Sequence, residues 1–200
     1  IRDGIPEMYL THFTEQRNDR LLELISEYGF YKAAVKGRED VFVKRLVVDA
    51  NETASLSPLD IASRFYPCFY DGISVRKFVV PILPQYHGRL FTTCEGRQLT
   101  LSEYAGNFII EGNTIKKAYI CHSKTKKMRA GDVILFYISR QRLVTSVGVV
   151  EEIHSRLQSS DDIIRRVGKR TVYSKDEIEK MAQKPCTILL FKHHFHLKKP

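Results

Sequence analysis

The run VILFYI at residues 133–138 constrains the fold of this chain more than any other segment. A continuous apolar run of this length is typical of a strand that is covered on both faces, so we expect residues 132–139 to form a central strand of a sheet. The segment 143–153 follows after a short turn and alternates as its partner strand. Gly148 interrupts this partner, which indicates a β-bulge or the close approach of another group.

The rest of the C-terminal half predicts two more strands and two short helices. We expect strands at 114–123 and 186–195, and helices at 159–168 and 174–182. Ser174 and Glu177 have the spacing of a capping box at the start of the second helix. Short strands around a helical insertion predict a small closed or half-closed β-barrel, and the fold class of the whole chain is α+β.

Residues 1–48 form a separate pattern of strand, helix and hairpin. The predicted strand is 8–13, the amphipathic helix is 17–30, and the two hairpin strands are 30–36 and 41–48. Gly29 should end the helix in the left-handed conformation, which a residue without Cβ adopts at no steric cost.

Residues 49–105 predict a structured connector. A short helix begins at Ser57-Pro58, and a strand at 75–83 contains Pro81, which marks a strand edge or end; the segment 84–105 reads as irregular chain. The connector contains more aromatic residues than a free linker would, so we expect it to pack on a domain formed by 106–200. These residues are Phe65, Tyr66, Phe69, Tyr70, Phe78, Tyr86 and Phe91, and a base-stacking surface is the alternative role for them.

Positive charge is concentrated in the C-terminal half. Residues 106–200 contain 19 lysine and arginine residues and 9 acidic residues, whereas residues 1–105 contain 13 and 14. A cationic domain attracts polyanions through long-range electrostatics and counterion release, so nucleic acid is the expected partner. A solvated cationic surface without a partner is the alternative.

Other ligand classes find less support in the sequence. No apolar run approaches the roughly 20 residues of a membrane span, so we expect no membrane partner and a cytoplasmic location. The four cysteines are too scattered to predict a zinc site or a redox pair. In KHHFH, residues 192–196, a strand would place His194 and His196 on one face and His193 on the other, so we expect no metal and no cofactor.

Three short motifs in the C-terminal half resemble those of a known superfamily. They are Gly131-Asp132 before a strand, Phe136-Tyr137-Ile138-Ser139 at its end, and Val147-Gly148-Val149-Val150 in the next strand. This ordered set resembles the PUA-like superfamily, in particular its EVE and ASCH branches, over about the last 95 residues. The resemblance implies binding of RNA or of a modified base.

A barrel of this kind could hold an unpaired base between its strands, with an aromatic face for stacking and cations for phosphates. We expect the polar ends of two strands to supply the pocket. These candidates are Asn113, Tyr119, His122 and Ser123 at the first strand, and Tyr137, Ser139 and Arg140 at the second. Ordinary core packing is the alternative role for Tyr119 and Tyr137.

The segment GKRTVYS, residues 168–174, reads as an exposed connection between the two helices. It brings together Lys169, Arg170, Thr171 and Tyr173, and such a mixture of cations, hydroxyl and aromatic ring suits a phosphate and a neighbouring base. A solvated loop is the alternative. A second basic loop at 124–129 would make nonspecific phosphate contacts or lie in solvent.

The N-terminal segment resembles the closing segment of the GNAT acetyltransferase fold, because Asn18 and Gly29-Phe30 stand at that family's spacing. The family's pyrophosphate-binding turn, Gln/Arg-x-x-Gly-x-Gly/Ala, does not occur in this sequence. Ile25 occupies the helix position at which many relatives carry a tyrosine acid. We therefore expect no acetyl transfer by this chain, and a first strand whose usual neighbours are missing, as in a fragment or a decayed remnant.

Three alternatives to a nucleic-acid-binding module remain. One is an acyl-CoA-dependent N-acetyltransferase whose cofactor-binding half lies outside this chain. Another is an enzyme acting on nucleic acid, for which Glu151-Glu152 and Asp161-Asp162 are the only paired carboxylates we single out. The third is a protein-docking scaffold, whose affinity would depend little on salt. The sequence does not indicate an oligomeric state.

Overall fold

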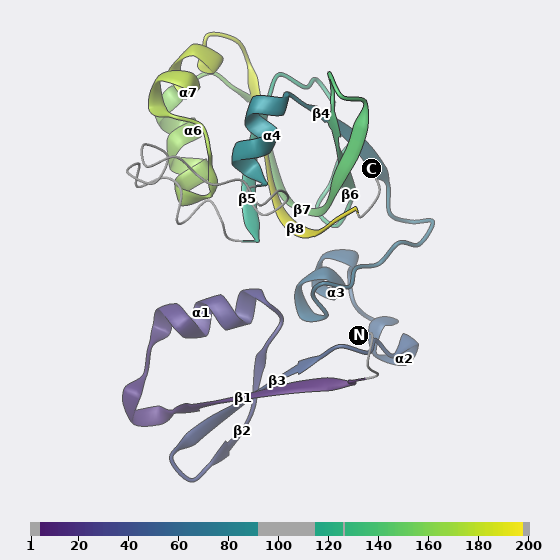
Figure 1. Cartoon of the computed structure of the whole chain (residues 1–200), viewed down its shortest axis with the longest axis vertical. Coiled ribbons are helices and arrows are strands. Elements are labelled where there is room, and N and C mark those ends of the chain that lie inside the picture. Colours follow the sequence, from purple (N-terminus) through teal and green to yellow (C-terminus); the bar gives the residue numbers. More distant parts are fainter. Residues whose placement is uncertain (1–4, 92–114, 126, 198–200) are drawn as a thin grey trace. The chain divides into compact units, whose positions relative to one another are not determined.

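A computed structural model describes residues 5–91, 115–125 and 127–197 of the chain. The chain divides into two compact units, Ile1–Val75 and Arg76–Pro200 (Figure 1). The boundary lies inside the segment 49–105, which we expected to be a connector that packs on the second domain. Its first part belongs to the N-terminal unit instead, and only the part from Arg76 onwards belongs to the C-terminal unit.

The N-terminal unit is a three-stranded antiparallel sheet with short helices. Its elements are β1 (Glu7–Phe13), the 3₁₀ helix η1 (Thr14–Gln16), α1 (Asp19–Glu27), β2 (Tyr31–Lys36), β3 (Glu39–Arg45), α2 (Ala50–Thr53) and α3 (Pro58–Arg64). The strand order is β1-β3-β2, so the predicted strand, helix and hairpin are confirmed. β1 pairs with β3 along its whole length, and the absence of the strands that usually flank it in the GNAT fold stays a prediction.

Local signals set the ends of α1 as the sequence suggests. The Asn18 side chain accepts a hydrogen bond from the Leu21 amide and so caps the helix. Gly29 has a φ of +87°, which confirms the predicted left-handed residue after the helix.

Two aromatic residues of the predicted connector are buried in the N-terminal unit. Phe65 and Tyr66 lie in its core, and the Tyr66 ring stands edge-on to Tyr28 at a centroid distance of 5.6 Å. The Lys44 ammonium lies 5.5 Å from the centroid of the same ring. These contacts explain why this part of the chain packs with β3 rather than with the second unit.

The C-terminal unit is built on a five-stranded sheet. Its elements are β4 (Lys77–Ile82), α4 (Pro84–Leu90), β5 (Lys116–Cys121), β6 (Val133–Ile138), β7 (Leu143–Leu157), α6 (Ser160–Val167), the 3₁₀ helix η3 (Gly168–Arg170), α7 (Lys175–Ala182) and β8 (Cys186–His196). The strand order is β4-β6-β7-β8-β5. The VILFYI strand is therefore central, as predicted, and the strand that contains Pro81 lies at an edge. The prediction of irregular chain from residue 84 was wrong for Pro84–Leu90, which form α4.

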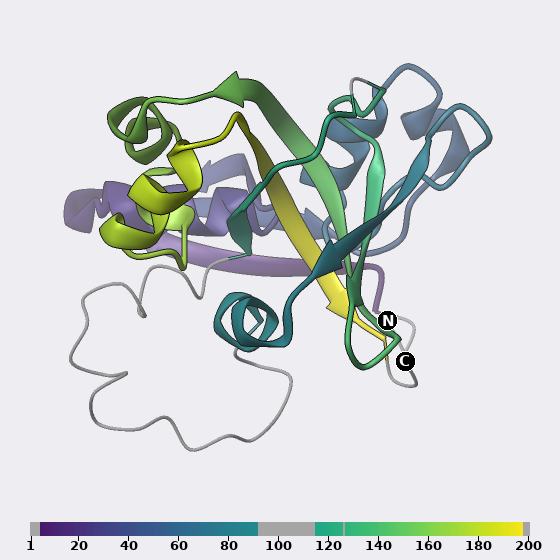
Figure 2. The same ribbon diagram turned by 90° about the horizontal axis from the view of Figure 1, so that it is seen from above.

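The five strands form a curled sheet, and within the described residues its closure into a barrel is not shown (Figures 1 and 2). Its pairings join β4 to β6, β6 to β7, β7 to β8 and β8 to β5, and in the described residues none joins β4 to β5. Instead, the Tyr119 hydroxyl of β5 donates a hydrogen bond of 2.8 Å to the Pro81 carbonyl of β4. The described residues therefore do not show a closed barrel, and a side chain links the two edge strands.

Aromatic side chains fill the inside of the curled sheet. The rings of Phe136 and Phe191 are fully buried, with their centroids 5.0 Å apart. Phe91 stands at 5.0 Å from Phe136, and Tyr119 at 5.7 Å. In the part of the chain that is described, the interior is therefore a packed aromatic core.

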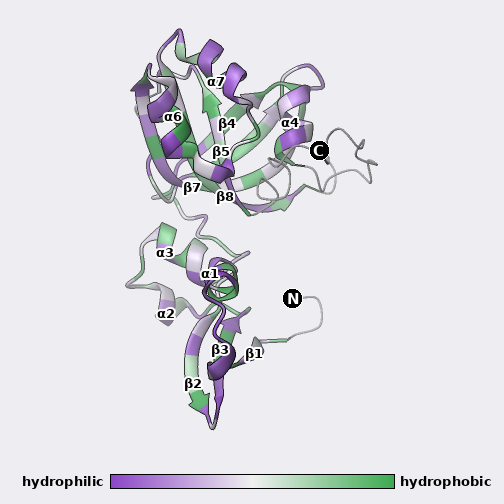
Figure 3. Ribbon diagram, turned by 90° about the vertical axis from the view of Figure 1, so that its left-hand side faces the viewer, coloured by the Kyte–Doolittle hydropathy of each residue, from purple (hydrophilic) through white to green (hydrophobic). Residues whose placement is uncertain are grey.

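The helices α6 and α7 add their apolar faces to this core. Ile163, Val167 and Ile178 are buried in it, while the opposite faces of both helices are hydrophilic (Figure 3). The predicted capping box of Ser174 and Glu177 is present at the start of α7. No helix among the described residues has the length and apolar character needed to cross a membrane.

Gly148 lies where β7 and β8 approach closely. The β7–β8 register shifts between Val147 and Gly148, which confirms the predicted irregularity. A Cβ at Gly148 would lie 2.7 Å from Cδ2 of Phe191 and 3.0 Å from the Lys192 carbonyl oxygen. Since Phe191 is part of the packed interior, this ring has little room to move.

We predict that Gly148→Ala lowers the free energy of unfolding by about 1–3 kcal/mol, because the added methyl overpacks the core. Gly168→Ala is the matched control, since a Cβ there meets nothing within 4 Å and only its φ of +51° is unfavourable. Urea denaturation of the two variants measures the difference. A Gly148→Ala variant as stable as the wild type would contradict the close approach.

Candidate nucleic-acid interface

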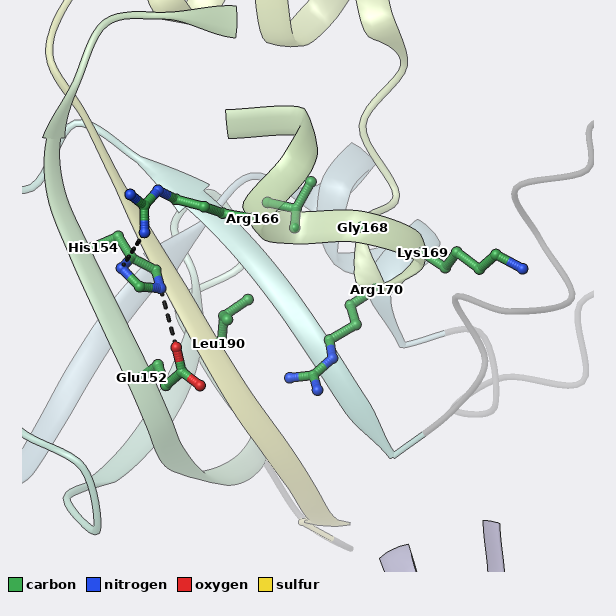
Figure 4. Close-up of a pocket in the computed structure, with 8 residues that line it drawn as sticks. Glu152, His154, Arg166, Gly168, Lys169, Arg170 and Leu190 are labelled. Carbon is green, nitrogen blue, oxygen red and sulfur yellow. Dashed lines mark hydrogen bonds and ion pairs between the residues drawn. The ribbon is translucent and has the colours of Figure 1, made fainter. Parts of the chain in front are cut away.

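A groove with a volume of about 520 Å³ lies on the C-terminal unit. It is formed by β7, β8, the end of α6 and η3 (Figure 4). The residues that line it are Glu152, His154, Arg166, Val167, Gly168, Lys169, Arg170 and Leu190. Three cations thus stand around the groove, which suits phosphate groups, while its two apolar lining residues, Val167 and Leu190, are themselves buried.

The sequence around α6 places the three cations together. The Ser159 side chain caps the first turn of α6 by accepting from the Asp162 amide. Gly168 ends the helix with a φ of +51°, a conformation that glycine favours. The chain then turns directly into η3, so that Arg166, Lys169 and Arg170 come from five consecutive residues.

Hydrogen bonds orient Arg166 toward the β7 side of the groove. Its Nε donates to Asp162 at 3.1 Å, and its Nη1 donates to Nδ1 of His154 at 3.1 Å. Since a guanidinium only donates, Nδ1 of His154 is the acceptor, and Nε2 therefore carries the proton and donates to Glu152 at 3.1 Å. Two of the five N–H groups of Arg166 are used in these bonds.

Acidic residues partly balance the cations of the groove. Nη1 of Arg170 lies 3.0 Å from a carboxylate oxygen of Glu151. Hydrogen bonds from Arg165 and Arg166 lower the pKa of the Asp162 carboxyl, which therefore stays ionised. Lys169 is exposed at the rim and points away from His154 and Arg166 (Figure 4). The carboxylates fix two guanidinium groups in place, and Lys169 extends the positive charge outward.

The predicted exposed loop at 168–174 is only half exposed. Lys169 and Arg170 line the groove, as the mixture of residues in this loop suggested. Thr171 and Tyr173, in contrast, are buried, and the Tyr173 hydroxyl donates to the Ile120 carbonyl at 3.2 Å. The expected exposure of these two side chains was wrong, because Tyr173 fills the space between α7 and the sheet.

Tyr119 also lies in the core rather than on a binding surface. Its ring is buried, and burial raises the pKa of its hydroxyl well above the ordinary value. Tyr137 is half-buried on β6. Tyr119 is therefore a core residue, as the alternative interpretation had it. Tyr137 is only partly covered.

The structure does not bring the other predicted pocket residues together. His122 and Ser123 follow the end of β5, whereas Ser139 and Arg140 follow the end of β6, and all four are exposed. Because β5 and β6 run in opposite directions in this sheet, their C-terminal ends lie at opposite ends of it. Asn113 lies outside the described residues. Whether any of these residues binds nucleic acid stays a prediction.

Of the eight lining residues, Lys169 and Arg170 were predicted as site residues and the other six were not. Arg166 belongs to a short helix whose Arg165-Arg166 pair was visible, but its orientation depends on Asp162 and His154. Glu152, His154 and Leu190 lie on strands that become neighbours only in the folded sheet. For Glu152 and His154, the alternation along β7 was the one available signal. Ile153 between them packs against the core, so its two neighbours point away from it.

The expected positions of the C-terminal histidines were wrong. The rings of His193 and His196 are 4.3 Å apart, because the β7–β8 register shifts in this region and breaks the alternation along β8. The residues that the structure describes contain no group of three or more His, Cys, Asp or Glu residues arranged to hold a metal ion.

His193 makes the stability of the fold depend on pH. Burial, together with the charges of His196, Lys117 and His194, lowers its pKa from 6.5 to about 3. When the pKa of a histidine is lower in the folded than in the unfolded chain, the free energy of unfolding decreases as the pH falls below about 6.5.

We predict that the free energy of unfolding of the wild type falls between pH 7 and pH 4 by about 1–3 kcal/mol more than that of a His193→Asn variant. Chemical denaturation at several pH values in phosphate-free buffer measures this difference. His122→Asn, a change at an exposed histidine, should retain the wild-type dependence. Identical pH profiles for wild type and His193→Asn would show that His193 is not a buried neutral imidazole.

Comparisons with known proteins identify related structures only. No family model and no curated protein matches the sequence. The fold is similar to the ASCH protein of Zymomonas mobilis, with a TM-score of 0.43 and 12% identity over 62% of this chain and 72% of that one. Two single-substitution variants of that protein give TM-scores of 0.44 and 0.43 at 12% and 11% identity, covering 73% and 75% of their chains.

These neighbours belong to the ASCH branch that the C-terminal motifs resemble. The GNAT-like origin of the N-terminal unit stays a prediction. A proposal about function therefore rests on the charges and contacts of this chain.

Proposed function

We propose that the unit Arg76–Pro200 binds nucleic acid through the groove between η3 and the β7–β8 edge, and that its ligand is RNA or another single strand. The observation that carries this proposal is the convergence of Arg166, Lys169 and Arg170 on one groove. Cations bind the phosphates of any sequence.

The form of the groove favours a single strand over a duplex. Its cations come from one short segment at the end of α6, whereas a duplex contacts proteins over long stretches of both backbones. The interior of the described sheet is a packed aromatic core. We therefore propose contact from outside the sheet, and a pocket that selects a modified base remains a prediction.

Neighbouring acidic groups set the strength of this interaction. Glu151, Glu152 and Asp162 offset part of the local positive charge, while the C-terminal half as a whole carries a net charge of +10 at neutral pH. We infer moderate affinity and a strong dependence on salt, because the overall field attracts the strand and a few groove contacts hold it.

The other interpretations of the chain find less in the geometry. An enzyme with clustered carboxylates would need Glu151 and Glu152 to be available for a metal, but these residues pair with Arg170 and His154. No contact in the described residues favours the acetyltransferase or the protein-docking scaffold over nucleic-acid binding. The proposed module needs neither a cofactor nor a membrane, and we propose a cytoplasmic location.

We predict that Lys169→Ala weakens binding of a short single-stranded RNA by about 3-fold to 10-fold at low salt and reduces the slope of log affinity against log salt by about one. This change removes a rim cation and leaves the Arg166–Asp162 and Arg170–Glu151 pairs intact. Fluorescence anisotropy at a series of salt concentrations measures both quantities.

Lys175→Ala is the matched control, because Lys175 is an exposed lysine of α7 outside the groove. It should retain nearly the wild-type affinity and slope. Equal losses for the two variants would assign binding to general surface charge, and affinity that does not change with salt would favour protein docking over nucleic acid.

A further inference from the structure

A cluster of histidines occupies the end of the curled sheet at which β6 and β8 finish and β5 and β7 begin. His193 and His196 come from β8, His87 comes from α4, and all three rings lie around Phe91 at centroid distances of 5.0–5.7 Å. Lys117 of β5 is buried with its ammonium 5.9 Å from the same ring. We call this set the histidine cluster.

Hydroxyl groups of β7 hold two of the imidazole rings. Oγ1 of Thr145 lies 2.6 Å from Nε2 of His87, and Oγ of Ser146 lies 2.9 Å from Nδ1 of His196. Ser146 is fully buried, so its role is to fix the ring rather than to react. The second nitrogen of each of these rings is thereby directed away from β7.

Nε2 of His193 is buried and has no hydrogen-bond partner among the described residues. A buried polar atom without a partner costs about 1–3 kcal/mol, so folded proteins rarely keep one without a reason. The His193 ring lies against His196 and belongs to the same end of the sheet. The atom therefore has unused hydrogen-bonding capacity within the described part of the fold.

Among the described residues, the charged groups that act on His193 lower its pKa, whereas a hydrogen bond with the Phe195 backbone raises it. His196, Lys117 and His194 each lower its pKa, and Lys117 also lowers the pKa of His196. Nitrogen donors on β5, β8 and α4 thus converge on a part of the fold where an added proton is repelled. A bound anion would reverse this repulsion and allow the imidazole rings to become protonated.

We propose that the histidine cluster binds a phosphate group, with Lys117, His193 and His196 as its donors. The ammonium of Lys117 supplies a fixed charge, while the two imidazole rings supply N–H donors and take up protons as the anion binds. This site lies on the opposite end of β7 from the groove of the proposed function and does not depend on it. Its ligand is either a free phosphate or nucleotide, or the terminal phosphate of a nucleic acid.

The test is a pH titration of the imidazole nitrogen-15 shifts of the full chain, with and without inorganic phosphate, at matched ionic strength in sodium chloride. We expect phosphate to raise the titration midpoints of His193 and His196 by about one pH unit or more, and to leave exposed His122 unchanged. The measurement uses the wild type, so it does not depend on whether a variant folds.

Two lysine variants locate the effect. Lys117→Met should abolish the phosphate-induced shift, whereas Lys116→Met, at the preceding position of β5, should retain it. Lys169→Ala should retain it too, since Lys169 belongs to the groove. Loss of the shift in Lys169→Ala, or its persistence in Lys117→Met with an unchanged amide spectrum, would overturn the assignment to the histidine cluster.

Two RNA arms distinguish the sources of the phosphate. If the same short RNA shifts His193 only when it carries a 5′-phosphate, the ligand is a nucleic-acid end, and if inorganic phosphate alone is sufficient, the ligand is a free phosphate or nucleotide. Should neither inorganic phosphate nor 5′-phosphorylated RNA move the midpoints of His193 and His196, the site does not exist. If Lys169→Ala weakens RNA binding while neither phosphate nor RNA moves the histidine midpoints, the groove proposal stands and the histidine-cluster proposal fails.

Discussion

The packing of aromatic rings inside the curled sheet is the interaction on which the rest of the C-terminal unit depends. Phe136, Phe191 and Phe91 lie in contact there, and Tyr119 joins them while its hydroxyl bridges β5 to β4. Such ring pairs contribute about 0.5–1.5 kcal/mol each beyond the apolar area that they bury. Among the described residues they hold the sheet in its curl without a closed ladder of backbone hydrogen bonds, and they also fill its interior.

This filled interior determines where ligands can bind. The polar and charged groups of the unit are displaced either to its outer surface, as in the groove beside η3, or to the end of the sheet, as in the histidine cluster. In the groove, Asp162 and Glu151 orient the guanidinium groups of Arg166 and Arg170. Fixed donors lose less conformational entropy on binding than freely moving ones, which compensates in part for the charge that the carboxylates neutralise.

The strands and helices could be predicted from the sequence because their signals are local. The VILFYI run, the Ser174 capping box and the left-handed Gly29 each follow from neighbouring residues, and each is present in the structure. The short helix α4 was missed because Pro84 and Gly88 in its sequence are typical of irregular chain. Its stability comes from packing, since His87 and Leu90 are buried.

The candidate site was predictable only in part because it depends on long-range pairing. Lys169 and Arg170 could be identified from the composition of their loop. His154 and Leu190 meet them only through the β7–β8 pairing, and Tyr119 and Tyr173 turned out to be core residues because the curl directs them inward. The register shift in β8 could not be read from KHHFH either, so the side of each histidine was assigned wrongly.

The most direct test of this account is to map the binding of a short single-stranded RNA by amide chemical-shift changes in the full chain. The account predicts the largest changes at Gly168, Lys169, Arg170 and His154, with small changes at the interior residues Phe136 and Phe191. Large changes at the interior residues, with none at η3, would contradict it, because they would show that the ligand enters the sheet rather than binding at its outer surface.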